Sequence, residues 1–265
     1  MGELTSAWPG ITQTCKVCDA SALLFDEVTV LQKYAVRYFR CDMCGFIQTE
    51  EPYWLVEAYS SAITKQDVGI MERNLDNLEV TSAVLNSLYP STKKAIDFGG
   101  GHGIFVRLMR DRGFNFHWAD SHASNDYARG FEHDASSSYD FLTCFEVLEH
   151  LRQPIVELEA MMSLSPNVLV STLLLPEPVP KIRDWWYYSP LSGQHVAFYT
   201  VASLRLIAHR FGRHLLSRGP YHLFSTEPKS SLVFRWVTRV KVARILNRLR
   251  SRPSLVESDH LQMSS

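Results

Sequence analysis

Hydrophobic and polar residues alternate in short blocks through the middle of the chain, and these blocks predict strands and helices in turn. The expected strands cover residues 93–98, 114–119, 139–145 and 167–174, and the expected helices cover 72–89, 103–112, 147–163 and 200–211. Residues 213–218 and 221–226 predict a closing antiparallel pair. Strands that alternate with helices indicate an α/β fold with an open, mostly parallel sheet and helices on both faces.

The two ends of the chain depart from this pattern. Residues 15–50 predict short strands around four cysteines, and residues 34–40 alternate up to the second cysteine pair, as in a small hairpin module. We therefore expect three parts: residues 1–66 form the cysteine module and a connector, 67–226 form the α/β domain, and 227–265 form a tail.

The tail is basic. No acidic residue occurs between Pro228 and Val256, and aliphatic residues alternate there with Arg235, Arg239, Lys241, Arg244, Arg248, Arg250 and Arg252. This pattern predicts an amphipathic surface helix with a solvated basic face. The alternative is a helix that lies on a membrane surface or on a partner.

Composition limits the partners of the chain. Its 265 residues are 46% hydrophobic, which is enough for one medium domain and a small satellite. The net charge of −1 gives no attraction of the whole protein to nucleic acid or to acidic membranes. Residues 1–14 lack the pattern of a secretory signal, and no apolar run reaches the roughly 18 residues of a membrane span. We expect a cytoplasmic protein.

The cysteines form two matched pairs, Cys15-x-x-Cys18 and Cys41-x-x-Cys44, with 22 residues between them. A gap of two residues lets two thiolates reach one ion from a tight turn, and four such sulfurs give the closed shell of a structural zinc site. Cytoplasmic thiols stay reduced, which disfavours disulfides. A redox role would require a helix after a pair, and none is expected. The fifth cysteine, Cys144, falls in a predicted buried strand and is interpreted as packing.

A glycine loop, Asp97-Phe-Gly99-Gly100-Gly101-His-Gly103, follows the first predicted strand of the domain and begins a helix. Glycines there permit positive φ and a close approach of a ligand to the backbone. The spacing differs from the dinucleotide pattern G-x-G-x-x-G, whose third glycine would fall on Ile104. Asp120 ends the next strand, where a carboxylate can accept the hydroxyls of a ribose.

From about residue 94 to 200 the chain resembles class I S-adenosylmethionine (SAM)-dependent methyltransferases. The segment AIDFGGGHGIF is similar to the first motif of that family, and YDFLTCFEVLEH is similar to its fourth-strand motif. The resemblance implies SAM as cofactor and a Rossmann-like fold, with a seven-stranded, mostly parallel sheet whose last strand is antiparallel. The two cysteine pairs, together with WWYYSPLSGQHVAFYT, resemble a branch in which a short zinc ribbon precedes the methyltransferase domain. Many members of that branch serve sugar, polysaccharide or secondary-metabolite biosynthesis.

The resemblance also implies the cofactor-binding residues. They are Asp97, Gly99, Gly100, Gly101 and Gly103 around the methionine and ribose parts, Asp120 at the ribose, Asp134 near the adenine amine, and Glu146 at the methionine end. The segment between Asp120 and Asp134 departs from the family, because it is too short for the usual second helix.

Two histidines are the candidate catalytic residues. An oxygen, nitrogen or carbon acceptor has to lose a proton, and a neutral imidazole is well populated near pH 7. We expect His195 to face the acceptor, because its loop follows a strand whose carboxyl end borders the ligand crevice. His150 is the second candidate, and capping of its own helix is the alternative. Residues 185–188 (WWYY) predict either an aromatic wall for a substrate or the packing of a loop.

Three functions follow from these features. The first is methyl transfer to a small molecule such as a sugar or nucleotide-sugar. The second is an RNA methyltransferase that grips RNA through its zinc ribbon, but residues 15–50 mix basic and acidic side chains and have no basic footprint. The third is a scaffold that binds SAM without transferring its methyl group.

Overall fold

The computed structural model describes residues 10–59 and 68–264, and its contacts divide the chain into two compact units. Unit 1 contains Met1–Ser61, Leu148–Glu157 and Leu173–Arg210. Unit 2 contains Ala62–Val147, Leu158–Thr172 and Phe211–Ser265. The predicted connector falls partly on residues 60–67, which lie outside the described residues, so the division at residues 66 and 226 stays a prediction.

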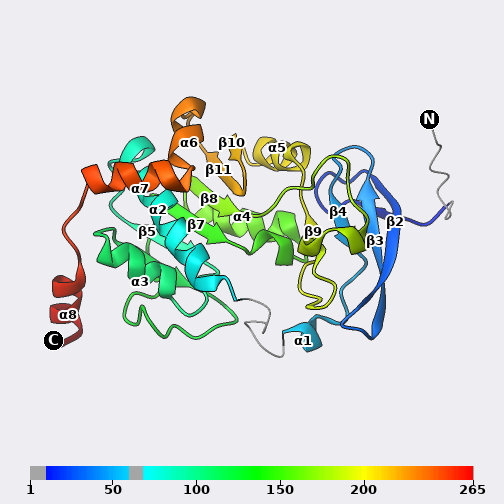
Figure 1. Ribbon diagram of the computed structural model, residues 1–265, viewed down its shortest axis with the longest axis horizontal. Helices are drawn as coiled ribbons and strands as arrows, with labels where there is room; N and C mark the ends of the chain where they lie inside the picture. Colours follow the sequence, from blue (N-terminus) through cyan, green and yellow to red (C-terminus); the bar gives the residue numbers. More distant parts are fainter. Residues whose placement is uncertain (1–9, 60–67, 265) are drawn as a thin grey trace. The chain divides into compact units, whose positions relative to one another are not determined.

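Unit 1 is built on an antiparallel sheet in the order β1-β2-β3-β4-β9 (Figure 1). Its strands are β1 (Thr12–Thr14), β2 (Ser21–Val30), β3 (Tyr34–Cys41), β4 (Ile47–Thr49) and β9 (Ala197–Phe198). Its helical segments are α1 (Leu55–Ala58), η1 (Leu148–His150), η2 (Ile182–Asp184), η3 (Trp186–Tyr188) and α5 (Val201–Arg210). The long β2–β3 pair is the hairpin that the alternation predicts.

A core of aliphatic and aromatic side chains holds unit 1 together. Val28 and Val36 face each other across the β2–β3 pair and pack with Trp54, Tyr188 and Phe198. The indole Nε1 of Trp54 donates a 2.8 Å hydrogen bond to the Gly193 carbonyl. Segments far apart in sequence thus share one buried cluster, which fixes the loops that carry the candidate histidines.

Unit 2 contains a sheet in the order β10-β11-β8-β7-β5-β6. Its strands are β5 (Ala95–Phe98), β6 (Phe116–Ala119), β7 (Phe141–Phe145), β8 (Asn167–Ser171), β10 (His214–Arg218) and β11 (Tyr221–Ser225). Strands β6, β5, β7 and β8 are parallel, and β11 runs antiparallel to both of its neighbours. The expected α/β class and the antiparallel last strand are confirmed.

The strand count of this sheet differs from the resemblance. Within the described residues the sheet has six strands rather than seven. At its β6 edge, a single parallel bridge joins Trp118 to Glu132 where a further strand would pair. Residues 121–131 form turns and bends without a helix. The segment between Asp120 and Asp134 is therefore too short for both a helix and a full strand, as its sequence indicated.

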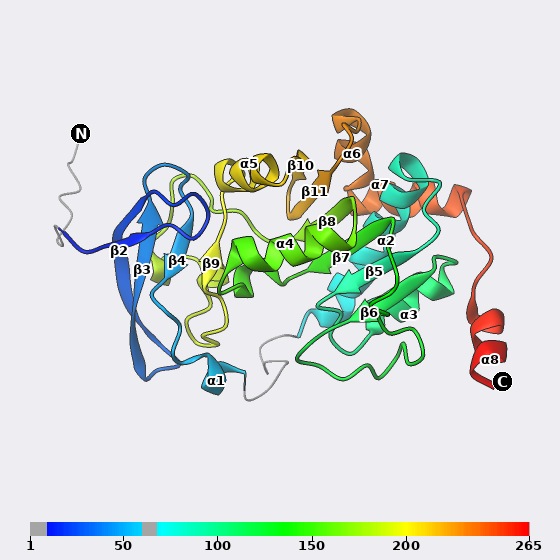
Figure 2. The ribbon, with the colours of Figure 1, turned by 180° about the vertical axis from the view of Figure 1, so that it is seen from behind.

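Helices cover both faces of the unit 2 sheet. Its helices are α2 (Ile70–Leu88), α3 (Ile104–Asp111), the C-terminal half of α4 (Pro154–Leu164), α6 (Ser231–Val237), α7 (Val240–Leu249) and α8 (Val256–Ser264). Figures 1 and 2 view the sheet from opposite sides, with α2, α3 and α7 over one face and α4 over the other. None of the helices in the described residues is both long enough and apolar enough to cross a membrane.

Two predicted helices differ from those in the structure. The helix predicted over 147–163 starts at Pro154, because proline suits the first helical position, and η1 precedes it. The tail forms α6, α7 and α8 rather than one helix, with Pro253 between the last two. Ala243 and Asn247 of α7 are buried, and the Asn247 amide donates a 2.9 Å hydrogen bond to the Glu79 carbonyl of α2.

Candidate functional site

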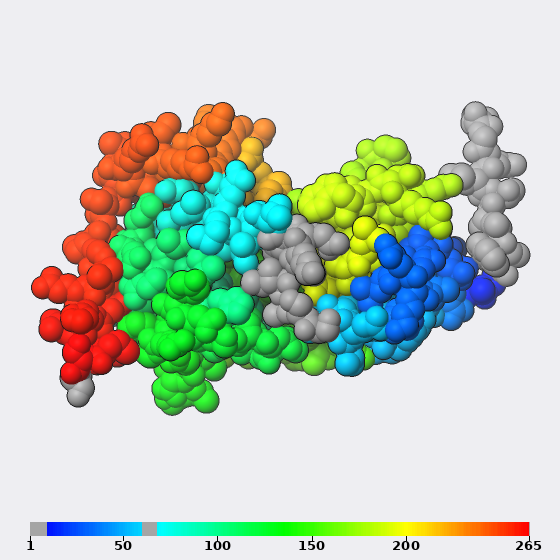
Figure 3. All heavy atoms as spheres, turned by 60° about the horizontal axis from the view of Figure 1, so that its bottom comes forward, coloured from blue at the N-terminus to red at the C-terminus, as the bar shows by residue number. Residues whose placement is uncertain are grey.

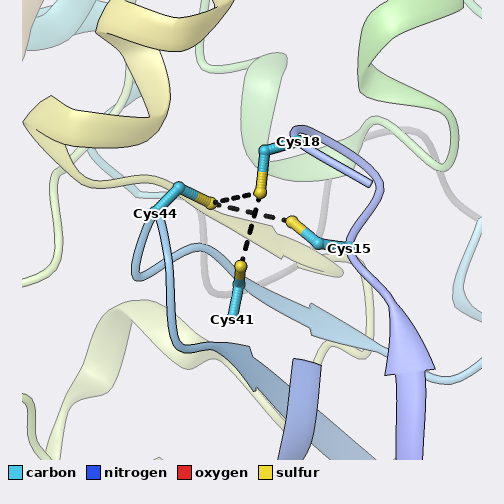
Figure 4. A group of neighbouring side chains, drawn as sticks. All are labelled: Cys15, Cys18, Cys41 and Cys44. Atoms are coloured by element: carbon cyan, nitrogen blue, oxygen red, sulfur yellow. Dashed lines mark hydrogen bonds between the residues drawn. The ribbon is translucent and has the colours of Figure 1, made fainter. Parts of the chain in front are cut away.

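Four cysteine thiols converge within unit 1 (Figure 4). Cys15 and Cys18 follow β1, and Cys41 and Cys44 lie at the end of β3. The Sγ of Cys18 lies 3.4 Å from that of Cys41 and 3.5 Å from that of Cys44, and Cys15 Sγ lies 3.6 Å from Cys44 Sγ. The four residues predicted as metal ligands are therefore brought together.

The geometry of this cluster fits a tetrahedral ion. Zinc–sulfur bonds of about 2.3 Å place sulfurs about 3.8 Å apart, close to the separations seen here. The amide of Val17 points at Cys15 Sγ over 3.5 Å, and the Gly45 amide donates to the Cys41 carbonyl over 2.9 Å. The hydrogen bond from Cys44 lowers the pKa of Cys15 to about 5 and raises that of Cys44. The four sulfurs thus have the spacing of ligands around one zinc ion.

The glycine loop lies in unit 2 at the carboxyl end of β5. Gly99, Gly101 and Gly103 have φ values of +72°, +52° and +86°, a conformation that glycine adopts without strain. The amides of Gly99 and Gly100 donate to the Ala119 carbonyl over 2.8 Å and 3.1 Å. These bonds tie the loop to the end of β6, the neighbouring parallel strand.

The glycines of this loop differ in what surrounds them. A Cβ at Gly99 would lie 2.6 Å from Val147 Cγ2, and one at Gly100 would lie 2.8 Å from Trp118 Cδ1. A Cβ at Gly103 would lie 2.6 Å from Asn125 Oδ1. Around Gly101, in contrast, no atom of the described residues, other than Gly101 and its two chain neighbours, lies within 4 Å of the added position. The loop is thus packed at three glycines and open at Gly101, where a ligand can approach the backbone.

Asp120 holds the glycine loop from the end of β6. Its Oδ2 accepts the Gly101 amide over 2.9 Å, and its Oδ1 accepts the amides of His122 and Ala123 over 2.7 Å and 2.9 Å. A carboxylate offers about four lone-pair positions, so these three bonds leave capacity for a further donor.

Asp97 is buried at the end of β5, with 4% of its surface exposed. The hydroxyl of Thr143 on β7 donates a 2.6 Å hydrogen bond to its Oδ1. Burial raises the pKa of Asp97 to about 7; the hydrogen bond from Thr143 opposes this rise, and the charge of Asp120 adds to it. A carboxylate in this position readily accepts a cationic ligand, which would offset the cost of burial.

Glu146 follows β7 in a left-handed conformation, with φ of +54°. Such a conformation costs a non-glycine residue of order 1–3 kcal/mol and is enriched at ligand sites. Ser171 at the end of β8 holds it in place, because its hydroxyl donates over 2.7 Å to Glu146 Oε1 and accepts the Glu146 amide over 3.0 Å.

Asp134 closes a local turn. Its carboxylate accepts the amide and hydroxyl of Ser136 over 3.0 Å and 2.6 Å, and its Oδ2 lies 3.3 Å from the hydroxyl of Ser137. The hydrogen bonds from Ser136 lower its pKa. These contacts account for Asp134 without a ligand, so its place near the adenine stays a prediction.

His150 and His195 lie together in unit 1, with ring centroids 4.8 Å apart and ring planes at 88°. The Nδ1 of His195 donates to the Tyr187 carbonyl over 2.6 Å, and that of His150 lies 3.1 Å from the Gln194 carbonyl and 2.9 Å from the Tyr59 hydroxyl. A carbonyl only accepts, so His195 carries its proton on Nδ1 and keeps a lone pair on Nε2. His150 does the same when its Nδ1 donates to the Gln194 carbonyl, whereas a proton on its Nε2 would let Nδ1 accept from the Tyr59 hydroxyl. Burial, together with the neighbouring His195, lowers the pKa of His150 to about 3, and the hydrogen bond with Gln194 opposes this shift.

The structure bears on two alternatives that the sequence left open, the role of His150 and the role of residues 185–188. His150 lies in η1 and binds the 194 loop, so it does not cap α4. Tyr187 and Tyr188 are buried, which supports packing rather than an aromatic wall, whereas Trp186 is exposed.

Glu149 is a site residue that the sequence did not predict. Its side chain is 1% exposed, and neither carboxylate oxygen has a hydrogen-bond partner among the described residues. One ligand atom each from Glu149, His150 and His195 lie within 4.8 Å of one another. The only sequence signal was its place beside His150, because its burial depends on distant segments of unit 1.

A family model described as a methyltransferase domain matches residues 71–217, which is more than half of the chain. The chain belongs to this methyltransferase family. It is an enzyme, a class I SAM-dependent methyltransferase, as the resemblance implied. Among curated proteins, none matches the chain.

Several solved structures are similar in fold. An O-methyltransferase family protein from Burkholderia thailandensis shares 16% identity, covers 66% of this chain and 68% of its own, and has a TM-score of 0.45. The magnesium protoporphyrin IX methyltransferase of Synechocystis PCC 6803, bound to SAH, shares 15% identity over 64% of this chain and 90% of its own (TM-score 0.43). The plantazolicin methyltransferase BpumL shares 10% identity over 74% and 87% (TM-score 0.48).

The residues of this methyltransferase fit its cofactor. SAM carries positive charge on its sulfonium and its amino group, and the buried Asp97 carboxyl provides a complementary group. The open backbone at Gly101 allows close approach. Of the predicted cofactor residues, Asp97, Asp120 and the four glycines meet at one edge of the sheet, where β5 and β6 end.

Proposed function

We propose that this methyltransferase transfers the methyl group of SAM to a small-molecule acceptor, in the class of sugars, nucleotide-sugars and related biosynthetic metabolites. The observation that carries this proposal is the pair of imidazoles in unit 1, in which the Tyr187 carbonyl fixes the Nδ1 proton of His195 and leaves its Nε2 lone pair available. The mixed charge of residues 15–50 supports a small molecule over RNA.

The cofactor is proposed to lie at the glycine loop. Asp97 and Glu146 would serve the methionine part, Asp120 the ribose hydroxyls and Asp134 the adenine amine. Gly99, Gly100, Gly101 and Gly103 shape the backbone that the cofactor contacts. Bound SAM supplies an activated methyl group, so the chain contributes mainly by positioning the acceptor and excluding water.

His195 and His150 are proposed to act on the acceptor: the Nε2 of His195 promotes the loss of its proton, and His150, which stays neutral because its pKa is about 3, positions the acceptor. The tautomer of His195 is favourable for this role, because the Tyr187 carbonyl keeps its proton on Nδ1. General base assistance of this kind contributes roughly 10²–10⁴-fold to a rate.

The four cysteines are proposed to bind one structural zinc ion. A closed shell of four thiolates has no open coordination position, so this ion takes no part in methyl transfer.

The test incubates the protein with SAM that carries a labelled methyl group and with sugars, nucleotide-sugars and RNA, and it measures which of these acceptors becomes labelled. Label in a sugar or nucleotide-sugar supports the proposal, and label in RNA alone overturns it. His195→Gln should lower the rate by roughly 10²-fold or more with SAM affinity unchanged. His209→Gln, on the exposed face of α5, is the matched control and should keep full activity.

A further inference from the structure

Glu149 is a buried carboxylate that the surrounding protein does not satisfy. Neither Oε1 nor Oε2 has a hydrogen-bond donor among the described residues, and the side chain is almost completely enclosed. An ionised carboxylate without donors or a counter-charge is strongly unfavourable inside a protein, and buried charges are paired or coordinate metals. The fold therefore implies a compensating partner for Glu149.

Two imidazole nitrogens face the same space. The ligand atoms of Glu149, His150 and His195 lie within 4.8 Å of one another, but no hydrogen bond joins any two of the three side chains. An ion with bonds of about 2.0–2.2 Å holds its ligands about 3.0–4.4 Å apart. The limit of 4.8 Å is slightly wider than this range, so small rotations of the three side chains would bring their ligand atoms onto a shared ion.

The outer contacts of the histidines suit metal binding. A histidine ligand usually donates its other ring N–H to a carbonyl or carboxylate, which fixes the ring and its tautomer. Here the Nδ1 of His195 donates to the Tyr187 carbonyl, and the Nδ1 of His150 faces the Gln194 carbonyl. The Nε2 of His195 is thus left as a ligand atom, and so is that of His150 when its Nδ1 donates to the Gln194 carbonyl.

The backbone that carries these residues is cross-linked. The Val196 amide donates to the Glu149 carbonyl over 2.8 Å, which joins the segment after His195 directly to η1. The Tyr199 hydroxyl donates to the Leu148 carbonyl over 3.0 Å. The three side chains are therefore positioned before any ligand arrives.

We propose that Glu149, His150 and His195 bind a divalent first-row transition-metal ion. Two imidazoles and one carboxylate are the donor set that suits such ions and leaves open coordination positions, whereas magnesium and calcium prefer oxygen ligands alone. This site differs from the four-cysteine cluster in its ligands and in its open positions.

The catalytic consequence rests on the proposed function. An acceptor hydroxyl on an open position of the ion would lose its proton to solvent more readily, as metal-bound water does. The oxygen would then form a bond to the methyl carbon as the carbon–sulfur bond breaks, which leaves S-adenosylhomocysteine. With their Nε2 atoms bound to the ion, the histidines would no longer accept the proton directly, and the ion would take over this part of the proposed function.

The binding test uses Mn²⁺ alone, titrated into full-length protein that holds one zinc ion per chain, the amount that fills the cysteine cluster, with free Mn²⁺ followed by its EPR signal. Wild type should bind one Mn²⁺ per chain, and Glu149→Gln should bind at least tenfold more weakly. Glu159→Gln, an exposed carboxylate on α4, should bind like wild type. Equal Mn²⁺ binding by Glu149→Gln and wild type overturns the site, as does the absence of binding by wild type.

Thermal unfolding serves as a control that distinguishes a lost metal site from a misfolded variant. Glu149→Gln removes an unsatisfied charge without changing shape, so its thermal midpoint without metal should be no lower than that of wild type. Added Mn²⁺ should raise the midpoint of wild type and of Glu159→Gln only. A midpoint that Mn²⁺ raises equally in Glu149→Gln contradicts the site. The proposed acceptor class is judged separately by methyl transfer, so either proposal can fail alone.

Discussion

Asp97 and Thr143 occupy paired positions on the neighbouring parallel strands β5 and β7, and the Thr143 hydroxyl donates a 2.6 Å hydrogen bond to the Asp97 carboxylate. The bond favours the ionised form, but burial disfavours it more strongly, so the pKa of Asp97 is raised to about 7. The loop that begins two residues later is therefore coupled to a group that titrates near neutral pH.

The stability of the SAM-free protein should depend on the protonation of Asp97. In the unfolded chain this carboxyl ionises near its ordinary pKa of 3.8, whereas in the folded protein it ionises near 7. The contribution of Asp97 to the free energy of unfolding is then greatest below about pH 4. It decreases by up to about 4 kcal/mol as the pH rises to 7. Asp97→Asn should remove this loss, as measured by urea unfolding at about pH 5 and pH 8.

Thr143→Val is the companion variant. It removes a hydrogen bond that favours the ionised carboxylate, so the pKa of Asp97 should rise further and the fall in stability should extend to higher pH. If Asp97→Asn keeps the pH dependence of wild type, the titrating group is not Asp97.

Alanine substitutions at Gly101 and Gly212 distinguish an effect on cofactor binding from an effect of backbone strain. Both have positive φ, +52° and +60°, and in the described part of the chain only their own residue and its two neighbours lie within 4 Å of an added Cβ. Alanine at either position should cost about 1–2 kcal/mol of stability. Only Gly101→Ala places a methyl group on the open face of the loop, so it alone should weaken SAM binding tenfold or more in calorimetry. Equal SAM affinity in the two variants would contradict the binding of the cofactor at this face of the loop.

The central sheet could be predicted because its signal is local. Parallel strands such as β7 are buried on both faces, so they form continuous apolar runs that the sequence displays directly. The cysteine cluster was also predictable, because a two-residue gap is a constraint on one turn. The start of α4 was placed too early, since η1 continues the apolar pattern up to Pro154.

The candidate acceptor site could be predicted only in part. His195 and His150 were recognised as chemical groups, but their pairing is made by hydrogen bonds between segments more than 40 residues apart. The burial of Glu149 depends on the same long-range contacts, and no local pattern distinguishes it from an exposed helix-start glutamate. Asp134 was assigned from the family alone, and its bonds to Ser136 show how a local turn satisfies such a residue.

Zinc binding should depend on the cysteine cluster and not on Cys144. Cys44→Ser removes one of the four sulfurs, so bound zinc per chain, measured by mass spectrometry of the metal, should fall sharply. Cys144→Ala is the control, because Cys144 is buried in β7 of the other unit and should leave zinc content unchanged. Chelation should also unfold the β1–β4 region, since metal binding and folding are coupled at such sites. Full zinc content in Cys44→Ser would contradict a four-thiolate site.

The C-terminal helix should be held by one buried ion pair. Arg110 of α3 and Asp259 of α8 are 5% and 6% exposed, and the Arg110 Nε and Nη2 donate to the two Asp259 oxygens over 2.9 Å and 2.6 Å. Burial acts to raise the pKa of Asp259, but the bonds from Arg110 and Arg107 lower it overall. Figure 3 shows α8 (red) against green atoms of this unit.

Asp259→Ala would leave the Arg110 charge buried without its partner, so urea unfolding should show a loss of about 3–5 kcal/mol. Asp76→Ala breaks the exposed ion pair between Asp76 of α2 and Arg244 of α7, and it should cost about 1 kcal/mol or less. Because the pKa of Asp259 is lowered, its contribution is present above about pH 4 and is lost as pH falls. The difference in unfolding free energy between Asp259→Ala and Asp76→Ala should therefore become smaller at acidic pH. A loss in Asp259→Ala no larger than in Asp76→Ala would show that α8 is held by its other contacts, such as the Leu255 amide on the Arg110 carbonyl.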